Sequence, residues 1–428
     1  MYRRRHGHRH DHPAGLSGAP VCRRLLETVR LLVAAVVVGA VAGAASFVFL
    51  EGLDAVTSLR TEWAWLILGL PVVGLALGLL AERAASDVTG GTAVVVDRAR
   101  RGGDDLPVAL APYALLGTWA THLVGGSAGR EGTALQLAGG LTGPISRGFR
   151  LGPDRRRHLL VAAIAAGFGA VFGVPLAGTV FAFEVGEGRR VRPTVLLAAL
   201  VAAFVGDGVV DLAGHDHASR AAVVAAGSPR TVVGLVVVGL ACGIAALAYV
   251  LATRAVRRVQ ARLVRRAALR PVVGGVVVLG AAAVVGPAYL GLSLPLADAA
   301  LAGAEVSAAA WLVKLVLTAV TVGSGFPGGE VTPLFVVGST VAVVVAPLVG
   351  IDPVVAAACG FVATFAGVAG TPLAGVVMAG EVFGVRSVPA AVVVCAVAAL
   401  VARRTPLYEP VAPAVEVSST RPEDRRAG

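Results

Sequence analysis

Residues 31–50, 65–82, 231–252 and 271–292 are long, nearly uninterrupted apolar runs. A helix needs about 20 apolar residues to cross the hydrocarbon core of a bilayer, and these runs supply that length. Charged residues make up only 15% of the 428-residue chain, whereas a soluble protein of this size carries roughly a quarter. The sequence therefore predicts an all-α polytopic protein of the cell membrane.

Shorter apolar segments lie among the long ones, including 132–145, 334–349 and 354–369, and many of the 55 glycines fall within apolar segments. In a membrane, glycine permits close helix approach and helix breaks, provided that the freed backbone groups line a cavity or face protein. Short, glycine-interrupted segments are typical of transporters built from broken helices.

The net charge of +11 comes almost wholly from arginine, and Lys314 is the single lysine. Arginines cluster near the N-terminus and at 100–103, 155–157 and 254–270. These clusters flank apolar segments, so positive-inside topology explains them better than nucleic-acid binding does. We therefore expect a cytoplasmic N-terminus, membrane lipid as a partner and no nucleic-acid partner.

Metal-binding and catalytic motifs are scarce in the sequence. The four cysteines are scattered without a C-x-x-C pair, which indicates buried thiols rather than a disulfide or a metal site. A disordered basic tail explains the N-terminal histidines better than a metal site does, although metal binding stays open for His6, His8, His10 and His12. No HExxH motif is present, and the acidic residues form no metal-binding cluster in the apolar segments, so we expect no enzyme, cofactor or metal centre.

Two pairs of segments repeat in the same order. Residues 168–185 match 365–382 around a shared PLAG at an offset of 197, and residues 126–135 match 325–334 at an offset of 199. The chain is therefore predicted to be an internal duplication. The predicted divisions are a basic tail (1–24), a first repeat half (25–253), a basic connecting region (254–270), a second repeat half (271–408) and a polar tail (409–428).

The two glycine-rich stretches at 126–129 and 325–328 come directly before helix-forming residues. Duplicated halves with broken helices bring such helix starts together near the membrane midplane. The first amide groups of a helix have no partner within the helix, and the helix dipole favours negative charge there. The sequence therefore predicts a central anion site where two repeats, inverted relative to each other, meet.

Four glutamates lie within apolar segments, where a carboxylate is costly and is by default a candidate for function. Glu131 begins a predicted helix among amides suited to an anion, so it could occupy that site, leave when protonated and exchange with a free anion. The repeat alignment gives Glu330 the same position in the second half. For Glu184 and Glu381, structural pairing with an arginine or a helix start is the competing interpretation.

The quoted motifs resemble the CLC family of chloride channels and anion/proton antiporters. The resemblance rests on GREG (129–132), AGFGAVFGVPLAG (166–178) and GSGFPGGEVTPLF (323–335), and it extends from about Arg30 to Tyr408. It implies a homodimer with one anion pathway per subunit, and it makes Glu131 the gating glutamate. Arg130 lies beside it, and we expect its side chain to anchor a neighbouring loop; direct contact with the anion is the alternative.

The sequence departs from the usual chloride pattern at three places. The chloride-binding serine loop is replaced near residues 89–97, where Gly91 is shared and Thr92 or Ala93 holds the serine's place. GREGP becomes GREGT, and GxFxP becomes GEVTP. These changes look like the fluoride/proton antiporter branch, which implies anion contacts at Gly129, Gly132, Thr133, Gly329, Val331 and Thr332.

Phenylalanine rings near the anion path are a further feature of the fluoride branch. Phe335 matches that pattern, and Phe181 or Phe183 supplies a second ring; hydrophobic packing is the alternative. Tyr408 matches the family's pore tyrosine. The inner proton-transfer glutamate of chloride antiporters falls on Val185, so Glu330 is the alternative proton carrier.

The predicted function is therefore export of fluoride in exchange for protons. A chloride-selective channel or chloride/proton antiporter is the first alternative, and a non-transporting membrane paralogue is the second. The expected partners are fluoride or chloride, protons and a second copy of the chain.

Overall fold

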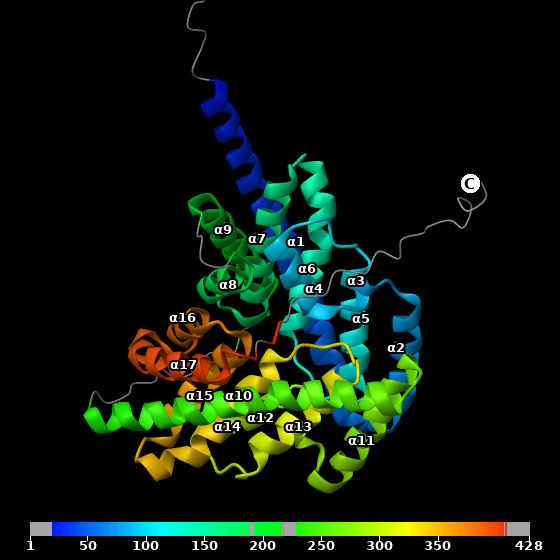
Figure 1. Cartoon of the computed structure of the whole chain (residues 1–428), viewed down its shortest axis with the longest axis vertical. Helices are drawn as coiled ribbons and strands as arrows, with labels where there is room; N and C mark the ends of the chain where they lie inside the picture. Colours follow the sequence, from blue (N-terminus) through cyan, green and yellow to red (C-terminus); the bar gives the residue numbers. More distant parts are fainter. Residues whose placement is uncertain (1–18, 188–191, 216, 218–227, 406, 409–428) are drawn as a thin grey trace, which may run out of the picture.

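A computed structural model describes residues 19–187, 192–215, 217, 228–405 and 407–408 (Figure 1). The predicted tail histidines and the polar C-terminal tail lie outside the described residues. The first helices are α1 (Ala19–Glu62), α2 (Leu70–Arg83), α3 (Ser86–Thr89), α4 (Gly91–Arg101), α5 (Leu110–Leu123), α6 (Glu131–Gly148), α7 (Pro153–Phe172), α8 (Pro175–Ala182) and α9 (Pro193–Leu212). They are followed by α10 (Pro229–Leu263), α11 (Arg270–Val285), α12 (Leu294–Leu301), α13 (Ala310–Gly323), α14 (Val331–Val349), α15 (Pro353–Ala369), α16 (Pro372–Phe383) and α17 (Val388–Ala402).

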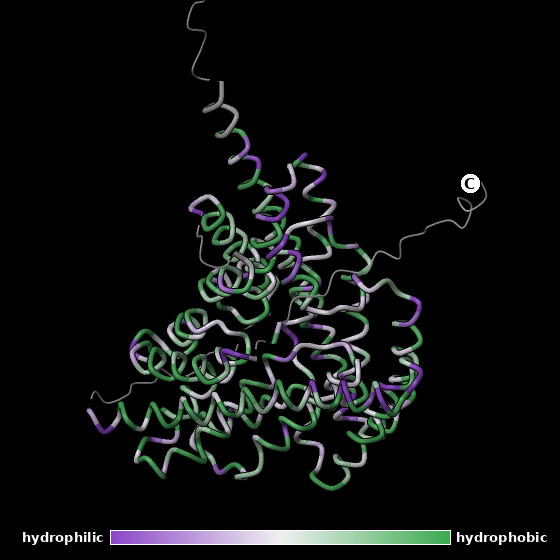
Figure 2. The backbone as a smooth tube through the Cα atoms, viewed as in Figure 1, coloured by the Kyte–Doolittle hydropathy of each residue, from purple (hydrophilic) through white to green (hydrophobic). Residues whose placement is uncertain are grey.

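Seven helical segments within the described residues are long and apolar enough to cross a membrane, and four further apolar helices are shorter. Large apolar side chains such as Val72, Val284 and Leu400 are exposed on the outside of the molecule. Figure 2 shows hydrophobic residues along most of the helices, with many of the hydrophilic ones near helix ends and in connections. An outer surface of this kind suits lipid, and the predicted all-α polytopic membrane fold is confirmed.

The duplication is visible as a matching order of helices. The helices α2, α5, α6 and α7 begin at Leu70, Leu110, Glu131 and Pro153, and their counterparts α11, α13, α14 and α15 begin 200 residues later in each case. The first helix of each series, α1 or α10, is the longest of that series. The predicted connecting region 254–270 therefore begins inside α10 and ends at the start of α11. The division into the five predicted ranges stays a prediction.

The two repeats meet through their glycine-rich loops. The amide of Gly129 donates to the carbonyl of Gly329 at 2.6 Å, and the amide of Gly329 donates back to Gly129 at 2.8 Å, as an isolated antiparallel bridge. An exchange of this kind relates the two loops by a local two-fold axis. It places the starts of α6 and α14 next to each other where the two repeats meet.

The other pair of repeated motifs makes a second reciprocal contact. The carboxylate of Glu184 accepts hydrogen bonds from the amides of Leu373 and Ala374, at the start of α16. The carboxylate of Glu381 accepts hydrogen bonds from Leu176 and Ala177, at the start of α8. Each repeat therefore caps a helix of the other, and the structure favours the pairing of these glutamates with helix starts.

We expect Glu381→Gln to destabilise the fold, because a neutral amide offers one acceptor where the carboxylate offers two to the free amides of α8. Loss of a cap costs about 1–2 kcal/mol. Thermal unfolding in detergent should show a lower midpoint than for Glu62→Gln, which changes an exposed glutamate at the end of α1. Equal midpoints for the two variants would remove the capping role.

Candidate functional site

The carboxylate of Glu131 lies at the start of α14, in the opposite repeat. Its Oε1 accepts a hydrogen bond from the amide of Val331. Its Oε2 accepts from the amide of Thr332 at 3.1 Å, from the hydroxyl of Thr332 at 2.8 Å and from the amide of Arg130 at 3.0 Å. Glu131 is 2% exposed. The first repeat therefore supplies a carboxylate, and the helix start of the second repeat supplies the amides that bind it. Free amides at a helix start are the kind of site that an anion prefers.

Glycines leave the room that this carboxylate needs. A Cβ atom at Gly129 would lie 2.8 Å from Oε1 of Glu131, and a Cβ at Gly329 would collide with the same oxygen and approach the amide of Gly132 to 2.8 Å. Real Cβ atoms do not approach other atoms this closely, so neither position accepts a side chain without displacement of its neighbours. The two glycines that join the repeats therefore also shape the site.

The structural register corrects the expected equivalence of Glu131 and Glu330. The caps of α6 and α14 are Arg130 and Glu330, with nearly identical backbone angles (φ −116° and −119°). Glu330 is therefore the counterpart of Arg130, and Val331 is the counterpart of Glu131. The sequence alignment was shifted by one residue because it matched the shared E-x-T pattern. The equivalent positions are set by where each helix begins, and only the backbone shows this. Glu330 interacts electrostatically with Arg257 of α10 and with Glu131.

Hydroxyl groups surround the start of α6. The Thr133 hydroxyl lies 2.6 Å from the hydroxyl of Thr118 on α5. The Thr92 hydroxyl, in the first turn of α4, approaches Gly132 so closely that a Cβ there would lie 2.6 Å away. Gly91 precedes it with φ +65°, a conformation that favours glycine. Ala93 follows on α4 and is partly exposed.

Phenylalanine rings from both repeats form one continuous cluster. The Phe335 ring stacks on Phe361 with centroids 4.1 Å apart, and it also contacts Phe172 at 5.3 Å and Phe365 at 5.8 Å. Phe181 stacks on Phe168 and contacts Phe365, and both of these rings lie between Phe181 and the rings around Phe335. The rings in direct contact with Phe335 are thus different from the predicted second ring, Phe181 or Phe183.

A cavity of about 60 Å³ adjoins the Glu131 site. Thr332, whose hydroxyl bonds to Glu131, is part of its wall. The guanidinium of Arg130 lies 5.4 Å from the centroid of the Phe172 ring at the same wall. The other lining residues are His217, Leu294, Phe335, Phe361, Met378 and Val382. One water needs about 10–15 Å³ of such volume, so a small anion fits.

Tyr408 is buried in the same core, and its backbone is held by α4. Arg100 donates from Nη1 to the carbonyl of Tyr408 at 3.1 Å and from Nε to the carbonyl of Val185 at 2.6 Å. The charges that act on the Tyr408 hydroxyl include Glu330 and Glu131. The predicted pore tyrosine therefore lies near both predicted glutamates.

Lys314 is fully buried beside the first glycine-rich loop. Its ammonium donates to the hydroxyls of Ser127 and Ser293 and to the carbonyls of Tyr289 and Gly291. These acceptors satisfy a buried cation without a carboxylate partner among the described residues. The structure gives Lys314 a structural role, which is to join Ser127 to the segment before α12.

Sequence reasoning missed Phe172, Phe361 and Thr118 as neighbours of the site. Phe172 lies within the quoted repeat motif, and Phe361 comes four residues before Phe365, which the repeat alignment had marked. Spacing of four residues on a helix places both rings on one face, so this signal was available. Thr118 offered no signal, because its partner Thr133 comes from another helix.

Comparisons with known proteins agree with this architecture. The sequence pattern of the family described as "Voltage gated chloride channel" matches residues 73–403. A protein of Pseudomonas syringae pv. tomato named "Chloride/fluoride channel protein" is 38% identical over 382 residues, which cover 87% of this chain and 84% of the relative.

Solved structures show the same relationship. The crystal structure of a CLC-type fluoride/proton antiporter matches with a TM-score of 0.85 and 32% identity, over 89% of this chain and 97% of that one. The structure of a slow cyanobacterial Cl⁻/H⁺ antiporter shares the fold at 20% identity, with a TM-score of 0.79 over 89% of this chain and 96% of that one. These relatives are named as channels or antiporters, which confirms the prediction of a transport protein rather than an enzyme. The chain is an anion transporter that belongs to the voltage-gated chloride channel (CLC) family.

Proposed function

We propose that this protein exports fluoride in exchange for protons. The observation that carries the proposal is the Glu131 carboxylate bound by the amides of Val331 and Thr332, beside the cavity lined by Phe335. The likeness to a structure named as a fluoride/proton antiporter supports the same assignment.

Protonation of Glu131 provides the coupling step. The deprotonated carboxylate accepts four hydrogen bonds. A protonated oxygen becomes a donor that faces other donors, so the side chain leaves the amides and an anion takes its place. Return of the carboxylate after it releases its proton expels the anion. One residue thereby links proton movement to anion movement.

Fluoride suits this site because it is small and strongly hydrated. A selective site must replace its water with closely placed donors. The amides of Val331 and Thr332 and the hydroxyl of Thr332 supply such donors. The positive edges of the Phe335 and Phe361 rings supply further favourable charge at the cavity wall.

The proposal includes a homodimer in the lipid of the cell membrane, with the N-terminus in the cytoplasm. The Arg-rich segments at 100–103 and 155–157 support this orientation, because positive charge favours the cytoplasmic side.

The test is anion efflux from liposomes that contain the purified protein, with fluoride and chloride compared and external pH recorded. Fast fluoride efflux with proton uptake and little chloride movement supports the proposal. Equal movement of chloride favours a general chloride transporter of the family, and no movement of either anion favours a non-transporting paralogue.

Phe335→Ile should reduce the preference for fluoride over chloride, because isoleucine keeps bulk but lacks a positively charged ring edge. Aromatic contacts of this kind contribute about 0.5–1.5 kcal/mol, which corresponds to roughly a twofold to tenfold change in the ratio of the two fluxes. Phe383→Ile is the matched control, because Phe383 packs against Phe361 but does not line the cavity. If both variants keep the parent's ratio, Phe335 serves only packing.

A further inference from the structure

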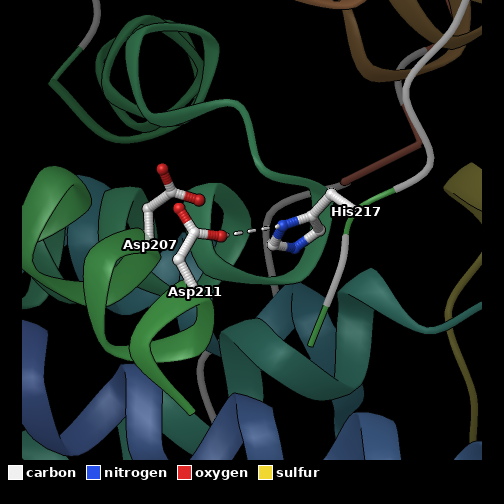
Figure 3. Close-up of side chains that lie close together, drawn as sticks. All are labelled: Asp207, Asp211 and His217. Carbon is white, nitrogen blue, oxygen red and sulfur yellow. Dashed lines mark ion pairs between the residues drawn. The ribbon is translucent and has the colours of Figure 1, made fainter. Parts of the chain in front are cut away.

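Three potential metal ligands converge where α9 ends. Oxygen atoms of Asp207 and Asp211 and a ring nitrogen of His217 lie within 4.8 Å of one another (Figure 3). The two aspartates are four residues apart on α9, so their side chains share one face of the helix. His217 comes from the segment that follows and faces them, with its Nδ1 3.5 Å from Oδ1 of Asp211.

The other ring nitrogen of His217 identifies its tautomer. Nε2 lies 3.0 Å from the carbonyl oxygen of Ala170, on α7. A carbonyl can only accept, so Nε2 carries the hydrogen, and in the neutral ring Nδ1 presents a lone pair to Asp211. Two acceptors therefore face each other, and an ion or a proton between them is needed to make the contact favourable.

A proton satisfies only part of this cluster. A hydrogen on Nδ1 points to one oxygen, that of Asp211, whereas Oδ1 of Asp207 is buried and has no hydrogen-bond partner within the described part of the chain. A cation at the centre attracts all three ligand atoms at once. The unpartnered oxygen thus favours a bound metal ion over a protonated histidine.

We propose that Asp207, Asp211 and His217 bind a zinc ion. Two carboxylate oxygens and one imidazole nitrogen form a three-ligand set that water completes to four. Magnesium and calcium prefer sites made of oxygen alone, so the imidazole favours zinc over them. The hydrogen bond from Nε2 to Ala170 orients the ring, as outer-sphere partners of zinc-binding histidines do.

The zinc site borders the anion path. His217 also lines the cavity with Arg130 and Phe335, so a metal bound on its Nδ1 holds the ring at that wall. The bound ion also places positive charge beside the space proposed for the anion. The binding of zinc itself does not depend on the transport assignment.

The experiment is calorimetric titration of zinc chloride into the purified full-length protein. His6, His8, His10 and His12 are first replaced by alanine, so that the N-terminal tail contributes no binding. This parent should bind about one zinc ion per chain. Loss of an outer-sphere partner lowers metal affinity about 10- to 100-fold, and we expect Asp207→Asn and His217→Ala each to lower it at least as much.

His215→Ala is the matched control. The His215 ring lies 5.8 Å from that of His217 but pairs with Glu51 at 3.0 Å, outside the cluster. It should keep the parent's affinity. A ligand that binds only the folded state stabilises it, so zinc should also raise the thermal midpoint of the parent and of His215→Ala. It should not raise the midpoint of Asp207→Asn, because asparagine has nearly the same size and shape as aspartate but lacks the charge that binds the ion.

Three results would overturn the proposal: no saturable zinc binding by the parent, an equal loss of affinity in His215→Ala, or an unchanged affinity in Asp207→Asn. Equally tight binding of calcium by the parent would overturn the assignment to zinc.

Discussion

Glu131→Gln is expected to abolish proton-coupled turnover. Glutamine cannot take up and release a proton in the physiological range, so the side chain can no longer alternate between its bound and released positions. Its amide group also places a donor against the amides of Val331, Thr332 or Arg130, where the carboxylate accepted four hydrogen bonds. Hydrogen bonds to a charged group contribute about 1.5–3 kcal/mol each, so glutamine binds the site weakly.

The measurement is proton uptake during fluoride efflux from liposomes that contain the variant. Proton uptake should fall to the level of liposomes without protein, while any remaining fluoride flux becomes independent of the pH gradient. Glu305→Gln is the control, because Glu305 is exposed in the connection between α12 and α13. Coupled flux equal to that of the parent would remove Glu131 from the mechanism.

The second large effect is expected for Gly329→Ala. The added Cβ would overlap Oε1 of Glu131 and lie 2.8 Å from the amide nitrogen of Gly132. The carboxylate can move aside but the backbone of α6 cannot, so the methyl group both displaces Glu131 and separates the two loops. We expect coupled fluoride flux to fall at least about tenfold, which corresponds to about 1.4 kcal/mol in the rate-limiting barrier.

Gly280→Ala is the matched control, because a Cβ at that position on α11 meets no atom within 4 Å. Helical alanine is favoured over glycine by about 1 kcal/mol, so this variant should be at least as stable as the parent and should transport normally. Flux measured beside the thermal midpoint separates a blocked site from an unfolded protein. A fully active Gly329→Ala protein would show that the carboxylate position in the structure does not govern transport.

The sequence predicted one pair of repeated motifs correctly and misaligned the other. The PLAG segments place Glu184 and Glu381 at equivalent positions, and the structure gives both the same task, to cap a helix of the opposite repeat. The alignment of the glycine-rich loops was one residue out, because letters such as E-x-T repeat by chance where glycine dominates. Only the backbone bridge between Gly129 and Gly329 decides that register.

The aromatic cluster shows a different case, in which the sequence indicated Phe335 but not the rings that contact it. Phe335 lines the cavity beside Thr332, where a ring was predicted. The neighbours that it contacts directly come from α7 and α15, whose rotation about their axes decides which ring faces the cavity. Hydrophobic patterns cannot report this rotation in a membrane protein, because the lipid-facing and buried faces of a helix are equally apolar.

By itself, the sequence determined the membrane environment, the helical class, the duplication and the presence of an acidic residue at a broken helix start. These properties follow from apolar length, from glycine and from repeated letters, all of which are local along the chain. Only the tertiary structure decided that the Glu131 carboxylate binds the amides of the other repeat, and that Asp207, Asp211 and His217 converge. Such contacts join residues of separate elements, so they depend on the packing of whole helices rather than on any one segment.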